Sequence, residues 1–226
     1  MKSNTYFKDS ALAALKGNWG QAVAATLVYF LIACAVAGPG FYMYVSLAGL
    51  SDPDEILEAV SPFLTYSSGS LLLEVFLLFP VVIAYLNSFR RLHLDGDNQL
   101  VKNTLDFCNY WNKVGAMVLM FILIFLWSLL FFIPGIIKSF SYAMTPYILD
   151  EDPELSPSEA IHRSRLMMKG HKFDLFWLWL SFIGWGILNI FTCGIGSLWL
   201  NPYIYTATAA FYQEVKADYQ MNGGLD

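Results

Sequence analysis

Two charged side chains interrupt otherwise apolar segments of this sequence. Glu74 is the acid in LLLEVFLLFPVVIAYL (residues 71–86), and Lys138 lies in a second long apolar segment. An isolated charge in hydrocarbon costs about 2.5–3.5 kcal/mol, so such residues usually pair or face water. We therefore expect a Glu74–Lys138 pair with a mainly structural role, or two charges that line a water-filled pocket open to the outside. The alternative is that each side chain extends separately to the outer interface.

Basic side chains gather at two places next to apolar segments, where they are suited to bind anionic lipid head groups. One group follows the acidic sequence EDPE (151–154), and the other follows the apolar segment that contains Glu74. The first consists of Arg163, Arg165, Lys169, His171 and Lys172; the second consists of Arg90 and Arg91, with His93 beside them. The simpler interpretation is general anchoring on the cytoplasmic side, which requires no specific lipid.

Motifs for catalysis and metal binding are missing from the sequence. His93, His162 and His171 show no metal-ligand spacing such as HExxH. There is no GxSxG elbow and no P-loop, and Glu74 has no second buried acid with which to form a proteolytic pair. The three cysteines are isolated. We therefore expect a protein that is not an enzyme and that holds no metal and no cofactor.

The composition indicates that these residues are positioned by membrane helices. Of the 226 residues, 57% are hydrophobic and 14% are charged, and the mean hydropathy is +0.50. Soluble domains carry about 25% charged residues, which they need to cover a surface in water. The net charge of −5 and the absence of a basic patch with interleaved aromatics argue against a nucleic-acid partner.

The apolar segments predict an all-α polytopic bundle of about six transmembrane helices, since one span needs about 20 residues. Breakers at Ile133-Pro134-Gly135 and at Cys193-Gly194-Ile195-Gly196 divide the two longest segments into hairpins. The six expected spans lie near residues 20–37, 71–90, 114–133, 136–150, 174–191 and 195–213, with the fourth short enough to be partial.

Charge distribution predicts the orientation of these spans. With both termini in the cytoplasm, twelve of the thirteen Lys and Arg residues fall inside, and only Lys138 falls outside. A single span over residues 114–149 would abolish this asymmetry. Tryptophans and tyrosines near the span ends predict an interfacial aromatic belt. Its members are Trp19, Trp111, Tyr142, Tyr147, Trp177 and Tyr212.

Two short amphipathic segments precede spans one and five and suggest an internal repeat. TYFKDSALAALKGNW (5–19) and SPSEAIHRSRLMMKGHK (156–172) each predict a helix that a glycine stops, and the second begins with a capping box, Ser156 to Glu159. Such helices are suited to lie in the membrane interface. We expect one integral membrane domain, residues 1–226, built from three units near 5–92, 103–150 and 156–215.

Several motifs carry a family resemblance. ALKGNW (14–19), IPGIIKSFSYAMTPYIL (133–149), RLMMKGHKFDLFWLWLSFIGWGIL (165–188) and GIGSLWLNPYIYTATAAFY (194–212) resemble the bacterial integral membrane family of domain of unknown function 975. A fainter similarity, in the order of Pro134-Gly135, Pro146, Glu151, Ala160, Arg163-Ser164 and Lys169-Gly170, runs to the membrane domain of some glycerophosphodiesterases. These resemblances imply a multi-pass protein of the bacterial inner membrane without an established activity.

Two functions are compatible with these observations. We expect a non-enzymatic scaffold, assembly factor or lipid-interacting protein, with membrane lipids as partners and with a second copy or another membrane protein as a further option. The alternative is a small transporter or amphiphile carrier with a cavity between hairpins. A carrier should contain a polar or amphipathic cavity that reaches mid-membrane, whereas a scaffold should have a packed apolar core.

Overall fold

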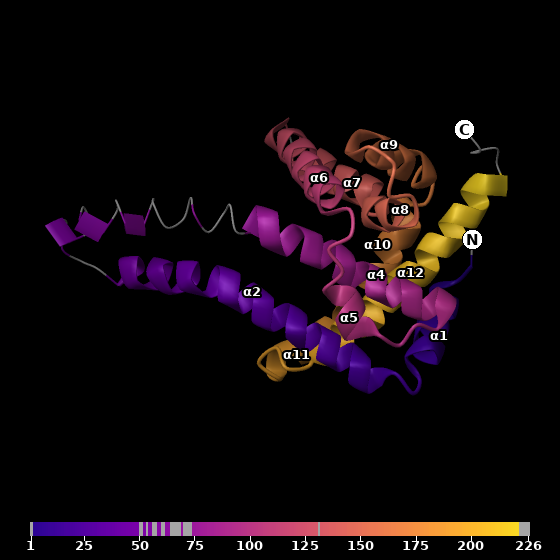
Figure 1. The fold of residues 1–226 in the computed structure, drawn as a ribbon, viewed down its shortest axis with the longest axis horizontal. Helices are drawn as coiled ribbons and strands as arrows, with labels where there is room; N and C mark the ends of the chain where they lie inside the picture. Colours follow the sequence, from indigo (N-terminus) through magenta and orange to yellow (C-terminus); the bar gives the residue numbers. More distant parts are fainter. Residues whose placement is uncertain are drawn as a thin grey trace.

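The chain folds into helices joined by short connections (Figure 1). The structure, a computed structural model, describes residues 2–49, 74–130 and 132–221, together with isolated positions between 52 and 69. This part of the chain contains no strand, as the all-α prediction requires. The elements are α1 (Asn4–Leu15), α2 (Trp19–Ala48), η1 (Glu74–Leu78), α4 (Phe79–Asp95), α5 (Leu100–Thr104), α6 (Tyr110–Leu130), α7 (Phe132–Tyr142), α8 (Thr145–Glu151), α9 (Pro157–Met167), α10 (Lys172–Leu180), α11 (Ile183–Phe191) and α12 (Ser197–Met221).

Three helical segments among the described residues are long and apolar enough to cross a membrane: Trp19–Ser46, Tyr110–Leu129 and Lys172–Phe191. They coincide with the first, third and fifth expected spans. The fifth is interrupted at Ser181 and Phe182, between α10 and α11. The expected spans 71–90, 136–150 and 195–213 are not among the three, and residues 71–73 lie outside the described part.

The predicted hairpin of residues 114–149 is present, but its return differs from one regular span. Helices α6 and α7 pack against each other and form the two sides of this hairpin. Gly135 lies where the two helices come closest, since a Cβ there would lie 2.1 Å from Ser128 Oγ and 3.1 Å from Ser128 Cα. The return then breaks between α7 and α8, two helices of 11 and 7 residues. Five consecutive residues of α8, Thr145 to Leu149, are buried in the protein.

The two short amphipathic helices form where the sequence predicts them. Ser156 and Glu159 make the expected capping box at the start of α9. Gly17 and Gly170 follow α1 and α9 with φ of +88° and +96°, a conformation that favours glycine at a helix end. Phe7, Ala11 and Leu15 form the buried face of α1, which packs along α12. The start of the expected second unit, near residue 103, has only the five-residue α5 (Leu100–Thr104) in the place of such a helix.

The core occupies the end of the molecule where both termini lie, and long helices project from it. In Figure 1, α2 extends away from the N and C labels as a long arm, whereas α4 lies among the other helices and has ten buried residues. Lys2 Nζ lies 3.0 Å from Glu214 Oε2, which joins the start of the chain to α12. Tyr147 and Tyr212 stack in this core with ring centroids 5.1 Å apart, so the prediction that they belong to an aromatic belt is wrong.

Candidate functional site

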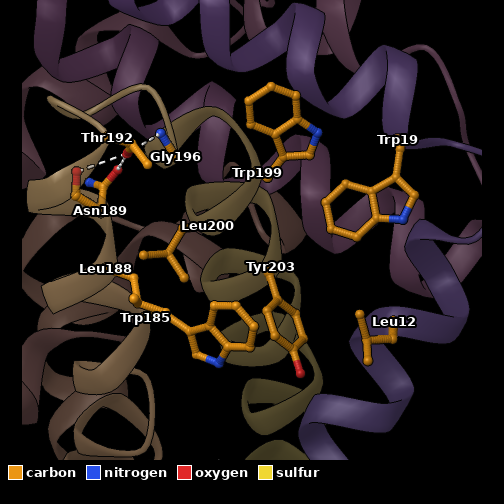
Figure 2. Close-up of a pocket in the computed structure, with 10 residues that line it drawn as sticks. All are labelled: Leu12, Trp19, Trp185, Leu188, Asn189, Thr192, Gly196, Trp199, Leu200 and Tyr203. Carbon is orange, nitrogen blue, oxygen red and sulfur yellow. Dashed lines mark hydrogen bonds between the residues drawn. The ribbon is translucent and has the colours of Figure 1, made fainter.

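An apolar pocket of about 550 Å³ lies between the corner that joins α1 to α2 and the turn that joins α11 to α12. Figure 2 shows aromatic side chains from both sides facing one another across it. Trp19 and Leu12 form one wall, and Trp199 and Tyr203 of α12 lie opposite. Helix α11 and the start of α12 complete the lining with Trp185, Leu188 and Leu200.

The α11–α12 turn holds the second wall in place. Cys193 and Gly194 have φ of +50° and +85°, which reverses the chain within a few residues. Thr192 Oγ1 donates to the Asn189 carbonyl oxygen at 2.9 Å and accepts from the Gly196 N–H at 3.0 Å. A Cβ on Gly196 would approach Asn189 Oδ1 to 2.8 Å, so a larger residue there would displace the Asn189 side chain. These residues form the polar end of the pocket (Figure 2).

The first wall is positioned by α1, which is fixed to the interruption between α10 and α11. Lys8 Nζ donates to the Ser181 carbonyl oxygen at 2.9 Å and lies 4.6 Å from the centre of the Phe182 ring. That carbonyl belongs to the interrupted segment, so Lys8 satisfies an acceptor that the helix leaves open. The Phe182 ring in turn contacts Tyr203 edge-on at 5.0 Å. Lys8 thus couples α1 to the wall of the pocket.

The lining restricts what the pocket can do chemically. None of its ten lining residues is a carboxylate, histidine, cysteine or lysine. Asn189, Thr192 and Tyr203 supply the polar side chains, whereas aromatic and leucine side chains supply most of the wall. The volume lies within the range of about 300–1,000 Å³ that small-molecule sites occupy. The pocket is therefore suited to hold an apolar chain and lacks the groups for acid–base or metal chemistry.

A polar cluster, here called the ionic junction, joins four parts of the chain: α4, α8, α12 and the segment that precedes α6. Arg90 contacts Asp150 and lies 3.1 Å from Glu151. Arg91 bridges Asp150 at 2.8 Å and Asp106 at 3.2 Å. Glu151 also accepts hydrogen bonds from Tyr212 and Lys216 of α12. The six charged members of the ionic junction are Arg90, Arg91, Asp106, Asp150, Glu151 and Lys216.

The ionic junction is nearly closed to solvent at its centre. The Arg90 and Asp150 side chains are 9% and 4% exposed. Arg90 Nε donates to Asn87 Oδ1, and Asn87 Nδ2 donates to the Pro146 carbonyl oxygen at 2.9 Å. Burial alone would raise the pKa of the Asp106 carboxyl. Hydrogen bonds from Cys108 and the charges of Lys113 and Arg91 outweigh it and hold that pKa below its ordinary value.

The predicted lipid-binding residues therefore fall into two groups: those that contact a carboxylate of the protein and those that do not. Arg90 and Arg91 are held by carboxylates of the ionic junction. Arg163 lies 3.3 Å from Asp152, and His171 lies between Asp174 and Asp218. The remaining members of the predicted group, Arg165, Lys169 and Lys172, form no ion pair within the described residues.

The two predicted intramembrane charges have different outcomes. The Glu74 side chain lies outside the described residues, so its pairing with Lys138 stays a prediction. Lys138 Nζ lies 4.4 Å from the centre of the Trp127 ring. The charges of Arg165 and Lys172 also act on the Lys138 ammonium. Charges on opposite sides of a hydrocarbon layer about 30 Å thick would not do so. This position differs from the expected placement of Lys138 at the outer face.

Sequence reasoning missed both the acids of the ionic junction and the pocket. A signal for the junction exists, because the adjacent pair Arg90-Arg91 and the adjacent pair Asp150-Glu151 each end an apolar segment on the same predicted side. The pocket has no comparable signal, since residues 12–19 and 185–203 meet only after folding.

Comparisons with known proteins give one result. Residues 129–219 match the family model described as protein of unknown function (DUF975), so the resemblance predicted from the sequence is confirmed over this part of the chain. This range contains α7 to α11, most of α12, eight of the ten pocket residues and the acids Asp150 and Glu151. No curated protein and no solved structure matched the chain, and the similarity to glycerophosphodiesterase membrane domains is not shown.

Proposed function

We propose that this chain is a non-enzymatic, multi-pass protein of the bacterial inner membrane whose aromatic pocket holds an acyl chain of a membrane lipid. The observation that carries the proposal is the apolar pocket of about 550 Å³ between the α1–α2 corner and the α11–α12 turn. Scaffold or assembly roles remain compatible with lipid binding at this site.

The lining chemistry favours an acyl chain over water. A bound water needs two to four polar partners, and the polar groups of this pocket are confined mainly to the Asn189–Thr192 end. A pocket that opens to hydrocarbon and stays empty forfeits the dispersion contacts of its walls. A lipid tail restores them, and the flat faces of Trp19, Trp185 and Trp199 offer large contact areas.

The proposal places both termini and the basic segments in the cytoplasm. The contacts that support one common side are the Lys2–Glu214 pair and the ionic junction, which brings Asp106 together with Arg91 and Asp150. Three free, exposed cysteines make this testable. In a variant that keeps only Cys108, which lies in the segment that supplies Asp106 to the ionic junction, a membrane-impermeant maleimide should label Cys108 only after lysis. Labelling of Cys108 in intact cells would contradict this placement.

The pocket is tested with a phospholipid that carries a photoreactive acyl chain. In vesicles, cross-links should concentrate on residues 185–203 and decrease severalfold in Leu188→Trp, because the larger ring fills the pocket. Ile187→Trp is the matched control: its position neighbours Leu188 in α11 and is similarly exposed, 53% against 56%, but does not line the pocket. Equal labelling in wild type and Leu188→Trp, or equal labelling along α6 and α11, would overturn the proposal.

A second candidate is a carrier for amphiphiles, which the interrupted helix favours. Transporters often build their sites beside discontinuous helices, and here the α10–α11 interruption lies beside the pocket through Phe182 and Tyr203. A carrier should move a fluorescent phospholipid between leaflets of proteoliposomes, and Leu188→Trp should slow this movement. Binding without movement between leaflets would leave the lipid-binding protein as the function.

A further inference from the structure

Three basic side chains from three different elements lie where α7 meets α9 and α10, and they have no carboxylate partner among the described side chains, which do not include Glu74. They are Lys138 of α7, Arg165 of α9 and Lys172 at the start of α10. Both neighbouring charges act on the Lys138 ammonium. Among the described residues, none of the three forms an ion pair. Asp174, two residues after Lys172, lies against His171 instead.

Packing between helices brings these cations together. Helix α7 contacts both α9 and α10. Between α7 and α10, Phe140 meets Phe176 and Trp179 with ring centroids 6.0 and 5.4 Å apart. These aromatic contacts fix how α7 and α10 pack, so the backbone of Lys138 stays close to α10. The Trp127 ring offers Lys138 a cation–π contact, which offsets only part of the repulsion.

These three cations differ from those of the ionic junction in their lack of carboxylate partners among the described residues. There, each guanidinium contacts two carboxylates, and Asp150 is shared by both. Like charges held together without an anion destabilise a fold, and a bound anion removes that cost. Each cation close to a membrane surface contributes about 1 kcal/mol to binding of anionic lipid.

An apolar surface continues from the three cations. Lys172, Phe176 and Trp179 follow one another at helical spacing along one side of α10. Phe173 and Trp177 are exposed beside them, at 72% and 54%. A ligand that fits this surface combines an anionic group with an apolar tail.

We propose that Lys138, Arg165 and Lys172 bind the phosphate group of an anionic phospholipid, whose chains lie along α10. This site is separate from the aromatic pocket, which α1, α11, α12 and the start of α2 line. It requires only the membrane setting of the proposed function and not lipid in the pocket.

The test is native mass spectrometry of the purified protein exchanged into phosphatidylglycerol or phosphatidylcholine. Wild type should retain phosphatidylglycerol preferentially, and Lys138→Gln, Arg165→Gln and Lys172→Gln should each reduce that retention at least threefold. Lys169→Gln is the matched control, because Lys169 is exposed near the end of α9 and does not act on Lys138. An equal loss in Lys169→Gln, or no loss in the three variants, would overturn the site.

Two further measurements keep the result interpretable. In detergent without lipid, Lys138→Gln should melt at a higher temperature than wild type, because one of three repelling charges is gone; a lower melting temperature would contradict the mutual repulsion. Inorganic phosphate in millimolar excess should not displace phosphatidylglycerol, and displacement would assign the site to free phosphate instead. Leu188→Trp should leave the preference for phosphatidylglycerol over phosphatidylcholine unchanged, which separates failure at the pocket from failure at this site.

Discussion

The ionic junction and the aromatic pocket are opposite arrangements of side chains inside one helical protein. In the ionic junction, Arg90 donates to three partners from α4 and α8, so its charge is satisfied within the protein. In the pocket, three tryptophans face a space of about 550 Å³ that no other part of the described chain fills. A region whose charges are paired within the protein stabilises the fold, whereas an unfilled pocket is available to a ligand.

The largest effect is expected from breaking the ionic junction. Asp150→Asn should lower the free energy of unfolding in detergent by about 3–5 kcal/mol, because the buried Arg90 guanidinium keeps its charge and loses a principal partner. Asp152→Asn is the control, since Asp152 meets Arg163 at a surface where both side chains are well exposed. Its effect should stay within about 1 kcal/mol. Similar effects for both variants would show that burial does not distinguish the junction from a surface pair.

A smaller effect is expected where α6 and α7 cross. Gly135→Ala should destabilise the protein by about 1–3 kcal/mol, because the new methyl group would collide with Ser128, including its backbone. Gly184→Ala in α11 is the matched control, since a Cβ there meets nothing within 4 Å. Replacing glycine by alanine at an open helical site should be neutral or stabilising. The stability of both variants is measured by unfolding in urea or SDS. A Gly135→Ala variant as stable as wild type would contradict the close crossing of α6 and α7.

The smallest effect concerns the acid dependence of the ionic junction. The pKa of Asp106 lies below its ordinary value of 3.8, so the ionised form is stabilised in the folded protein. That contribution is present above about pH 4 and disappears as the pH falls through the folded-state pKa. Between pH 6 and pH 3, wild type should therefore lose more stability than Asp106→Asn, by about 1 kcal/mol or less. Parallel pH profiles would contradict this role.

Local features of this fold could be predicted from the sequence because their signals lie within a few residues. The Ser156–Glu159 capping box and the glycines after α1 and α9 determine helix ends by short-range hydrogen bonds and backbone conformation. The hairpin of α6 and α7 follows from an apolar segment too long for one span, with Pro134-Gly135 near its middle.

Features that depend on distant residues could not be predicted in the same way. Positive-inside counting placed Lys138 at the outer face, because it assigns a side to each charge without regard to which helices pack together. The short α7 instead holds Lys138 near Arg165. Hydropathy identifies Tyr147 and Tyr212 as aromatic residues near span ends, but only their packing shows that they stack in the core. The contribution of Trp19 to the pocket could not be predicted either, because it depends on the turn after α1.

The most direct test of the account is the thermal shift that added phosphatidylcholine produces in detergent, measured on wild type, Asp150→Asn, Leu188→Trp and Ile187→Trp. A ligand that binds only the folded state raises its melting temperature with concentration. Asp150→Asn should start from a lower melting temperature yet show the wild-type shift, and Ile187→Trp should match wild type. Leu188→Trp should keep the wild-type starting value and lose most of the shift. A full shift in Leu188→Trp, or a lost shift in Asp150→Asn, would contradict the separation of a structural junction from a lipid-binding pocket.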